Sequence, residues 1–282
     1  VLVSAMEHNA VMRPVVQLAG RGVAFDRIPC GADGSLRMEE AEKLLRPETK
    51  AVVMLHGSNV CGTLMPAEEM GAFCRRHGLV FILDTAQTAG VFPIDMEAMH
   101  IDALAFTGHK GLLGPQGTGI LLCGRTPDPI LRGGTGSESK NQEMPDFLPD
   151  RGEAGTLNVP GIAGLSAGLA LVTETGVERI FRREAGEAAF CARGLWNLGY
   201  RVFTGANQSG TVSFLPNQDC ETAASRLAEL GIACRAGLHC APLAHESAGT
   251  LATGTVRLSF GHSCSRQESR EFLRRMGNFP GG

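Results

Sequence analysis

Short apolar runs alternate with amphipathic segments along the first half of the chain. Residues 51–55 (AVVML) and 80–83 (VFIL) are apolar throughout, as in parallel strands that are covered on both faces. Helical patterns occupy residues 38–45 and 67–77, and Gly78 is placed to end the second helix. Strands that alternate with helices in this way predict an α/β fold with a mostly parallel, doubly wound sheet.

The same rules predict the remaining elements. Further strands are expected at residues 1–6, 23–29, 200–205, 210–216, 231–236, 255–261 and at both ends of 102–123; further helices are expected at residues 10–19, 162–175, 177–198, 222–230 and 266–276. The later elements form an α+β pattern. We therefore expect a large domain over residues 1–171 and a smaller C-terminal domain over residues 172–282.

Polar residues stand where the expected strands end. His8 follows the first strand, Asn59 follows residues 51–55, and Asp84 ends the next strand with Gln87 just beyond it. Taken singly, such residues are more often helix caps or turn formers than ligand contacts. In a doubly wound sheet, however, ligands bind beyond the carboxyl ends of the strands, so their convergence predicts a binding crevice.

A glycine-rich turn within residues 102–123 carries Thr107, His109 and Lys110. A single lysine in a loop is usually a solvated charge, but glycines here let the backbone come close to another group. The long irregular segment 125–160 is of a kind that is usually functional or disordered. Its end, residues 153–158, is a candidate turn for binding an anion, with a solvated linker as the alternative.

The C-terminal half contains a second candidate cluster. Cys240 lies in a polar loop beside Arg235 and His239, and nearby positive charge favours the reactive thiolate. Arg257 lies in a strand, where an arginine is usually solvated, but its planar fork would suit a carboxylate in a crevice. His239, Cys240 and His245 lack the paired spacing of zinc ligands, so we predict no metal site.

Composition limits the kinds of binding partner and the cellular compartment that we expect for this protein. The net charge is −3, and no apolar run reaches the roughly 18 to 20 residues of a membrane-spanning helix, so we expect neither nucleic acid nor membrane as a partner. The nine cysteines include no CxxC pair, which indicates reduced thiols in a cytoplasmic protein.

Seven segments together resemble one enzyme family. MEHNAVMRP, HGSNVCGT, FILDTAQTAG, FTGHKGLLGPQGTG, EAGTLNVPG, RAGLHCAP and TVRLSFG are similar, in this order, to segments of the fold-type I enzymes that use pyridoxal 5'-phosphate (PLP). The resemblance is to class V aminotransferases and cysteine desulfurases, and the RAGLHCAP segment resembles the short-cysteine-loop branch that includes selenocysteine lyases. It implies PLP as the cofactor and an amino acid as the substrate.

The resemblance also implies a role for each candidate residue. Lys110 would form the Schiff base with PLP, Asp84 would pair with the pyridinium nitrogen, and His8 would stack on the ring as a further catalytic group. The remaining cofactor contacts would come from Asn59, Gln87, Thr107, His109 and, across a homodimer, Thr156. Arg257, supported by Arg235 and Asn59, would bind the substrate carboxylate, and Cys240 would accept sulfur as a persulfide.

These roles leave three functional alternatives. The first is a PLP-dependent cysteine desulfurase that converts L-cysteine to L-alanine, or a selenocysteine lyase, with a sulfur-acceptor protein as a further partner. The second is a class V aminotransferase or other PLP lyase in which Cys240 is a spectator. The third is a cofactor-free binding protein that keeps the fold.

The sequence departs from the family pattern in three places. Leu238 stands where that branch often has a second histidine, and Pro242 comes one residue earlier than usual. Family members also have a small-domain helix and a Gly/Thr-rich phosphate-binding loop upstream of the EHN segment. We expect this chain to be an N-terminally truncated form that binds PLP poorly.

Overall fold

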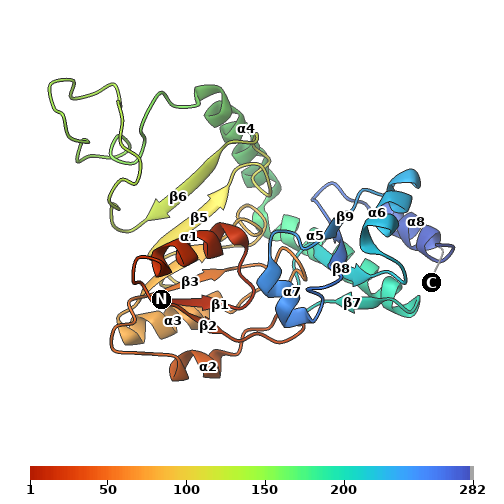
Figure 1. The fold of residues 1–282 in the computed structure, drawn as a ribbon. Helices are drawn as coiled ribbons and strands as arrows, with labels where there is room; N and C mark the ends of the chain where they lie inside the picture. The colour runs from red at the N-terminus through yellow and green to blue at the C-terminus, as the bar shows by residue number, and fades with distance from the viewer. Residues whose placement is uncertain (280–282) are drawn as a thin grey trace.

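A computed structural model describes residues 1–279 and contains two sheets. The larger sheet has six strands in the order β2-β1-β3-β4-β5-β6 (Figure 1). Its strands are β1 (Leu2–Ser4), β2 (Asp26–Ile28), β3 (Ala51–Leu55), β4 (Val80–Asp84), β5 (Ala103–Thr107) and β6 (Gly119–Cys123). Only the β5–β6 pair is antiparallel among these neighbours, so the predicted α/β fold with a mostly parallel sheet is confirmed.

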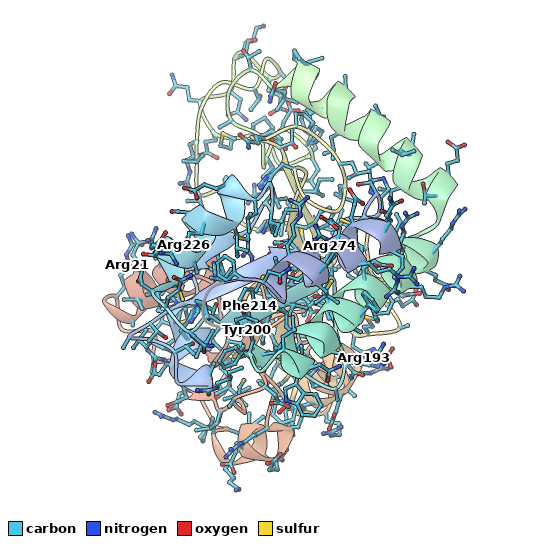
Figure 2. All side chains as sticks on the ribbon, turned by 90° about the vertical axis from the view of Figure 1, so that its right-hand side faces the viewer. Arg21, Arg193, Tyr200, Phe214, Arg226 and Arg274 are labelled. Carbon is cyan, nitrogen blue, oxygen red and sulfur yellow. The ribbon has the colours of Figure 1, made fainter. Side chains whose placement is uncertain are left out.

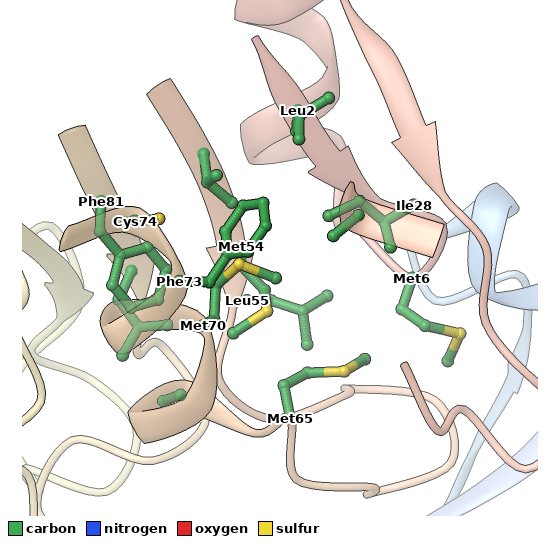
Figure 3. Close-up of a cluster of buried hydrophobic side chains, with 14 of the residues drawn as sticks. Leu2, Met6, Ile28, Met54, Leu55, Met65, Met70, Phe73, Cys74 and Phe81 are labelled. Carbon is green, nitrogen blue, oxygen red and sulfur yellow. The ribbon is translucent and has the colours of Figure 1, made fainter. Parts of the chain in front are cut away.

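Both faces of the larger sheet are covered, which explains why its central strands are apolar without alternation. Helix α3 (Ala67–His77) packs Met70 and Phe73 on one face beside Met54, in a cluster that also contains Leu2 (Figure 3). Helix α1 (Asn9–Ala19) packs on the opposite face, against Val3. Helix α2 (Met38–Lys43) lies between β2 and β3 in the chain.

Local sequence sets where the first helices begin and end. The backbone of His8 is extended and its ring accepts a hydrogen bond from the amide of Ala10, which caps the start of α1. Gly78 ends α3 in the left-handed conformation, at φ 63° and ψ 32°, as the sequence predicted. The cap at His8 therefore places this residue in the short connection between the carboxyl end of β1 and the start of α1.

The smaller sheet is antiparallel, with the order β7-β8-β10-β9. Its strands are β7 (Arg201–Phe203), β8 (Thr211–Leu215), β9 (Arg235–Gly237) and β10 (Thr255–Ser259), and its helices are α6 (Cys220–Glu229) and α8 (Arg266–Met276). The rings of Tyr200 and Phe214 meet edge to face at 5.5 Å in its core (Figure 2). The expected α+β C-terminal pattern is confirmed.

Two consecutive helices, α4 (Val159–Thr175) and α5 (Val177–Asn197), connect the layers. Residues 124–158 precede α4 and project away from both sheets as an irregular segment (Figure 1). The expected domain boundary at residues 171/172 falls within α4 and stays a prediction. In residues 1–279, no helix is long and apolar enough to cross a membrane.

Two differences from the expected elements lie near Cys240. The strand expected at residues 231–236 is β9 and starts four residues later. The polar loop expected around Cys240 is instead a tight turn followed by helix α7 (Pro242–Ala248). Pro242 begins this helix, where its missing N–H costs nothing, but the seven-residue segment is too short for a clear helical pattern.

Candidate active site

The carboxyl edge of the larger sheet gathers the expected polar residues. The chain places β2 and β3 on opposite sides of β1, so the strand order reverses between β1 and β3. His8 follows β1, Asn59 follows β3, Asp84 ends β4 and Lys110 follows β5. A reversal of this kind opens a crevice for a ligand, and these four residues lie around it.

Charge and burial act together on His8 and Lys110. Burial lowers the pKa of the Lys110 amine, Asp84 opposes this shift, and the positive charge of Arg257 adds to it. Burial and then Lys110 lower the pKa of His8, so its imidazole is neutral near pH 7. A larger fraction of the Lys110 amine is therefore neutral than in an ordinary lysine, and this amine lies near the Asp84 carboxylate and the neutral His8 ring.

Thr107 and His109, which were both expected to contact an anion, lie within hydrogen-bonding distance of each other in the glycine-rich turn. The Thr107 hydroxyl lies 2.6 Å from Nδ1 of His109. The neighbouring glycines have structural reasons of their own: a Cβ on Gly111 would lie 2.5 Å from the Ala89 carbonyl oxygen, and Gly117 has a φ of +78°. The glycine at position 111 therefore allows the turn to pack closely on the loop that contains Ala89. The sequence alone does not tell whether a glycine serves such packing or the close approach of a ligand.

Two arginines face the crevice from the smaller sheet. Arg257 of β10 is paired directly with Arg235 of β9 in the antiparallel register. Burial and then Arg235 lower the pKa of Arg257, while Cys240 raises it. Like charges opposite each other destabilise a sheet, and the buried Nε of Arg257 has no hydrogen-bond partner in residues 1–279. The pair is therefore suited to an anionic group such as a carboxylate.

Cys240 is presented on a strained turn. Residues 238–241, the cysteine turn, are closed by a 2.9 Å hydrogen bond from the Ala241 amide to the Leu238 carbonyl oxygen. Its central residues, His239 and Cys240, have φ values of 51° and 57°. Residue Cys240 is exposed, whereas His239 is buried with Nε2 3.1 Å from the Thr255 hydroxyl.

Asn59 and Arg257 connect the two sheets at this point. The Asn59 side-chain amide donates to the His239 carbonyl oxygen at 2.6 Å. Arg257 donates to the Asn59 carbonyl oxygen at 3.0 Å. The buried Oδ1 of Asn59 has no hydrogen-bond partner in the described chain. Asn59 therefore has one polar atom committed to the cysteine turn and another that a ligand could complete.

Glu7 belongs to this region but was not predicted from the sequence. Its side chain is fully buried and accepts hydrogen bonds from the Ser4 hydroxyl and, at 3.0 Å, from the Leu55 amide. Burial raises its pKa to about 8, the hydrogen bonds oppose this shift, and the charge of Asp84 adds to it. The only sequence signal is an acidic residue beside His8 at the end of an apolar strand.

A cavity of about 350 Å³ joins residues from both sheets. Gln87, Lys110 and Arg257 contribute to its wall, as predicted for neighbours in one crevice, and so does Glu184 of α5. Burial raises the pKa of Glu184 to about 7, opposed by a backbone hydrogen bond from His262. Glu184 was missed because one glutamate in a long amphipathic helix has no distinguishing pattern.

Thr156 is not brought to this crevice within the chain. It is exposed in the projecting segment before α4. Within residues 1–279, no hydrogen bond or charge interaction joins it to Lys110 or Asp84.

The described residues also contain no group of three or more His, Cys, Asp or Glu side chains arranged to hold a metal.

Sequence and structure comparisons agree on the relatives. The model of the aminotransferase class-V family matches residues 1–272. Probable cysteine desulfurases of Pyrococcus abyssi and Halalkalibacterium halodurans are each 32% identical and align with 97% and 86% of this chain. The apo structure of a cysteine desulfurase from Thermococcus onnurineus covers 98% of the chain with a TM-score of 0.89 and 32% identity.

The length of the chain differs from that of these relatives. It spans 70% of the Pyrococcus protein, 61% of the Halalkalibacterium protein and 72% of the Thermococcus chain. The fold is that of an α/β enzyme with a mostly parallel sheet. The chain belongs to the class-V aminotransferase family.

Proposed function

We propose that the chain is a PLP-dependent cysteine desulfurase that converts L-cysteine to L-alanine and receives the sulfur on Cys240 as a persulfide. The observation that carries the proposal is an exposed cysteine, Cys240, beside Arg257 at the same crevice as Lys110 and Asp84. An aminotransferase needs the lysine and the carboxylate but has no use for the thiol. The relatives named as cysteine desulfurases support the same choice.

The side chains of the crevice fit PLP. Lys110 is an amine of lowered pKa close to the acidic Asp84, as an aldehyde and a protonated pyridine ring require. Asn59 offers a buried acceptor oxygen without a partner, and buried polar atoms of this kind are normally satisfied. Thr107 and His109 supply polar groups for the phosphate. His8 would cover the ring, and Gln87 would contact its phenolic side.

The proposed chemistry divides among the cofactor and the residues of the chain. When bound, PLP supplies an aldehyde for the substrate amine and a ring that accepts electrons. Arg257, with Arg235 beside it, orients the substrate carboxylate. The neutral amine of Lys110 moves the proton at the substrate α-carbon.

Cys240 carries out the sulfur transfer. Its thiolate attacks the sulfur of the substrate, so an S–S bond forms as the carbon–sulfur bond breaks. The electron pair of the broken bond remains with the carbon skeleton, which takes up a proton and leaves as alanine. The balance is cysteine plus the Cys240 thiol giving alanine plus the Cys240 persulfide, with no external oxidant.

Two substitutions test this function. Lys110→Ala is expected to abolish covalent retention of PLP, measured by mass spectrometry after borohydride reduction. Cys240→Ser is expected to retain PLP but to lower sulfide and alanine release from cysteine at least a hundredfold, since serine cannot form a persulfide. The exposed Lys140→Ala is a control that should leave both properties unchanged.

The outcomes separate the alternatives. Undiminished sulfur release by Cys240→Ser would make this residue a spectator and favour an aminotransferase or another lyase. PLP retention that survives Lys110→Ala would remove the assignment of the lysine. A protein that binds no PLP at any concentration would instead support the cofactor-free alternative.

We also infer that the working form is a homodimer. Thr156 is exposed on a segment that projects from its own subunit, so it is available to a second copy. The family resemblance assigns this threonine to the phosphate site of the neighbouring subunit. The homodimer would therefore complete a phosphate site that each chain holds only in part.

A further inference from the structure

The cysteine turn has a backbone conformation that its own sequence does not favour. Positive φ at both central residues is typical of a type I′ turn, which normally contains glycine, asparagine or aspartate. In this turn the positions hold His239 and Cys240, and each non-glycine residue in the left-handed region costs about 1–2 kcal/mol. Contacts from outside the turn must therefore hold it.

Two hydrogen bonds from the larger sheet domain supply such contacts. The Asn59 side chain donates to the His239 carbonyl oxygen at 2.6 Å, across 180 positions of sequence. The backbone amide of Asn9, at the start of α1, donates to the Cys240 carbonyl oxygen at 2.8 Å. The carbonyls of both strained residues are thus bound by groups from the segments that follow β1 and β3.

We propose that Asn59 and Asn9 are positioning residues that hold the cysteine turn in its strained conformation and so aim the Cys240 thiol at the crevice. The effect of this role on catalysis rests on the proposed function. The two hydrogen bonds that restrain the turn need no cofactor. It is distinct from a ligand contact, because Asn59 uses Nδ2 for the turn while Oδ1 has no partner in the described chain. The amide orientation is fixed, since only Nδ2 can donate to the carbonyl oxygen.

The backbone bond from Asn9 can be removed without disturbing α1. Asn9 is the first residue of the helix, where proline is favoured because its N–H has no partner within the helix. The preceding residue, His8, has φ −70° and ψ 155°, which is the conformation that proline requires of its neighbour. Asn9→Pro therefore deletes the donor, and Asn9→Ala is a matched control that keeps it.

The second bond is tested by Asn59→Asp, which keeps the shape of the side chain but turns an acceptor toward the His239 carbonyl. Hydrogen exchange of the amides in residues 238–245 of the cofactor-free protein is the first measurement. Loss of one hydrogen bond is expected to speed this exchange several-fold to about tenfold in Asn9→Pro and Asn59→Asp. Asn9→Ala is expected to exchange at the wild-type rate.

The rate of Cys240 alkylation by iodoacetamide at one fixed pH, followed by site-resolved mass spectrometry, is the second measurement. Both variants are expected to change this rate, because the two hydrogen bonds no longer hold the exposed thiol in one orientation. Asn9→Ala is expected to be alkylated at the wild-type rate. Wild-type exchange and alkylation in folded Asn9→Pro would overturn the proposal, even if Asn59→Asp failed to fold.

Turnover separates this proposal from the proposed function. In PLP-loaded protein, Asn9→Pro is expected to lower kcat for sulfur release several-fold with little change in KM. A wild-type protein that loads PLP but releases no sulfur would refute the desulfurase function, while the exchange results would still decide the role of the two asparagines. An active enzyme with an unchanged turn in both variants would refute the positioning role alone.

Discussion

At the residue scale, burial gives two glutamates near the crevice unusual acid–base behaviour. Glu7 joins the carboxyl ends of β1 and β3 through Ser4 and Leu55, while Glu184 contributes to the cavity wall. A carboxyl that loses water without gaining a cation remains protonated to higher pH. Both are therefore protonated over part of the pH range in which an ordinary glutamate is charged.

Glu7→Gln should flatten the pH dependence of stability. The folded pKa of Glu7 is raised from 4.5 to about 8, so the stability linked to its proton is complete below about pH 4.5 and is lost as pH rises through about 8. Glutamine cannot ionise, so the variant should lack this loss, which amounts to a few kcal/mol. Urea unfolding of the cofactor-free protein from about pH 5 to 8 measures the effect.

A surface substitution provides the comparison for Glu7→Gln. Glu48 is exposed, so Glu48→Gln should retain the wild-type slope of unfolding free energy against pH. If Glu7→Gln also retained that slope, the buried carboxyl would be ionised in the folded protein and our account of its environment would be wrong.

At the element scale, most helices and strands follow from local sequence, whereas close contacts between them do not. The apolar runs of β3 and β4 and the Gly78 end of α3 were predictable, because periodicity and a left-handed glycine act within a few residues. Helix α7 was not, since its seven residues are too few for a clear helical pattern and the turn before it also depends on hydrogen bonds from distant residues.

Gly71 shows how an element depends on a neighbour. A Cβ at this position of α3 would lie 1.8 Å from the Met99 carbonyl oxygen in the loop that leads to β5. Gly71→Ala should therefore lower the free energy of unfolding by about 1–3 kcal/mol through overpacking, measured by urea denaturation.

A second helical glycine makes a matched control. Gly186 lies inside α5 and a Cβ there would meet no atom within 4 Å. Gly186→Ala should stabilise the protein by about 0.5–1 kcal/mol through helix propensity alone. If both substitutions changed the free energy of unfolding by the same amount, close packing against Met99 would not explain why residue 71 is a glycine.

At the scale of the whole molecule, the candidate site is shared by two sheets. Asp84 ends β4 and Lys110 follows β5 of the larger sheet, whereas Arg257 lies in β10 of the smaller sheet and Cys240 lies in the turn after β9. The proposed homodimer extends this sharing to a second chain through Thr156.

Mixing two inactive variants tests that sharing. Lys110→Ala and Thr156→Ala should each have little activity alone, for lack of the amine and of the partner's phosphate contact. Mixed after dissociation and reassembly, they should recover part of the wild-type sulfur release, because a hybrid holds one site with both residues intact. Light scattering establishes the dimer, and a monomeric active protein or a mixture without recovery would contradict the arrangement.

The fold class and most of the polar residues at the crevice could be predicted from the amino-acid sequence. Parallel strands bring their carboxyl ends to one edge, so His8, Asn59, Asp84 and Lys110 could be placed together from their positions after apolar runs. Such placement requires only the order of elements and the rule that ligands bind at this edge.

The partners and the environment of those residues became visible only in the folded chain. Asn59 binds the carbonyl of His239, and Arg257 lies opposite Arg235, through contacts whose geometry no local pattern contains. The raised pKa of Glu7 likewise depends on burial by strands from separate parts of the chain. Hydrogen-bond partners and desolvation are set by groups far apart in sequence, whereas periodicity is set by near neighbours, and this difference separates what could be predicted from what had to be observed.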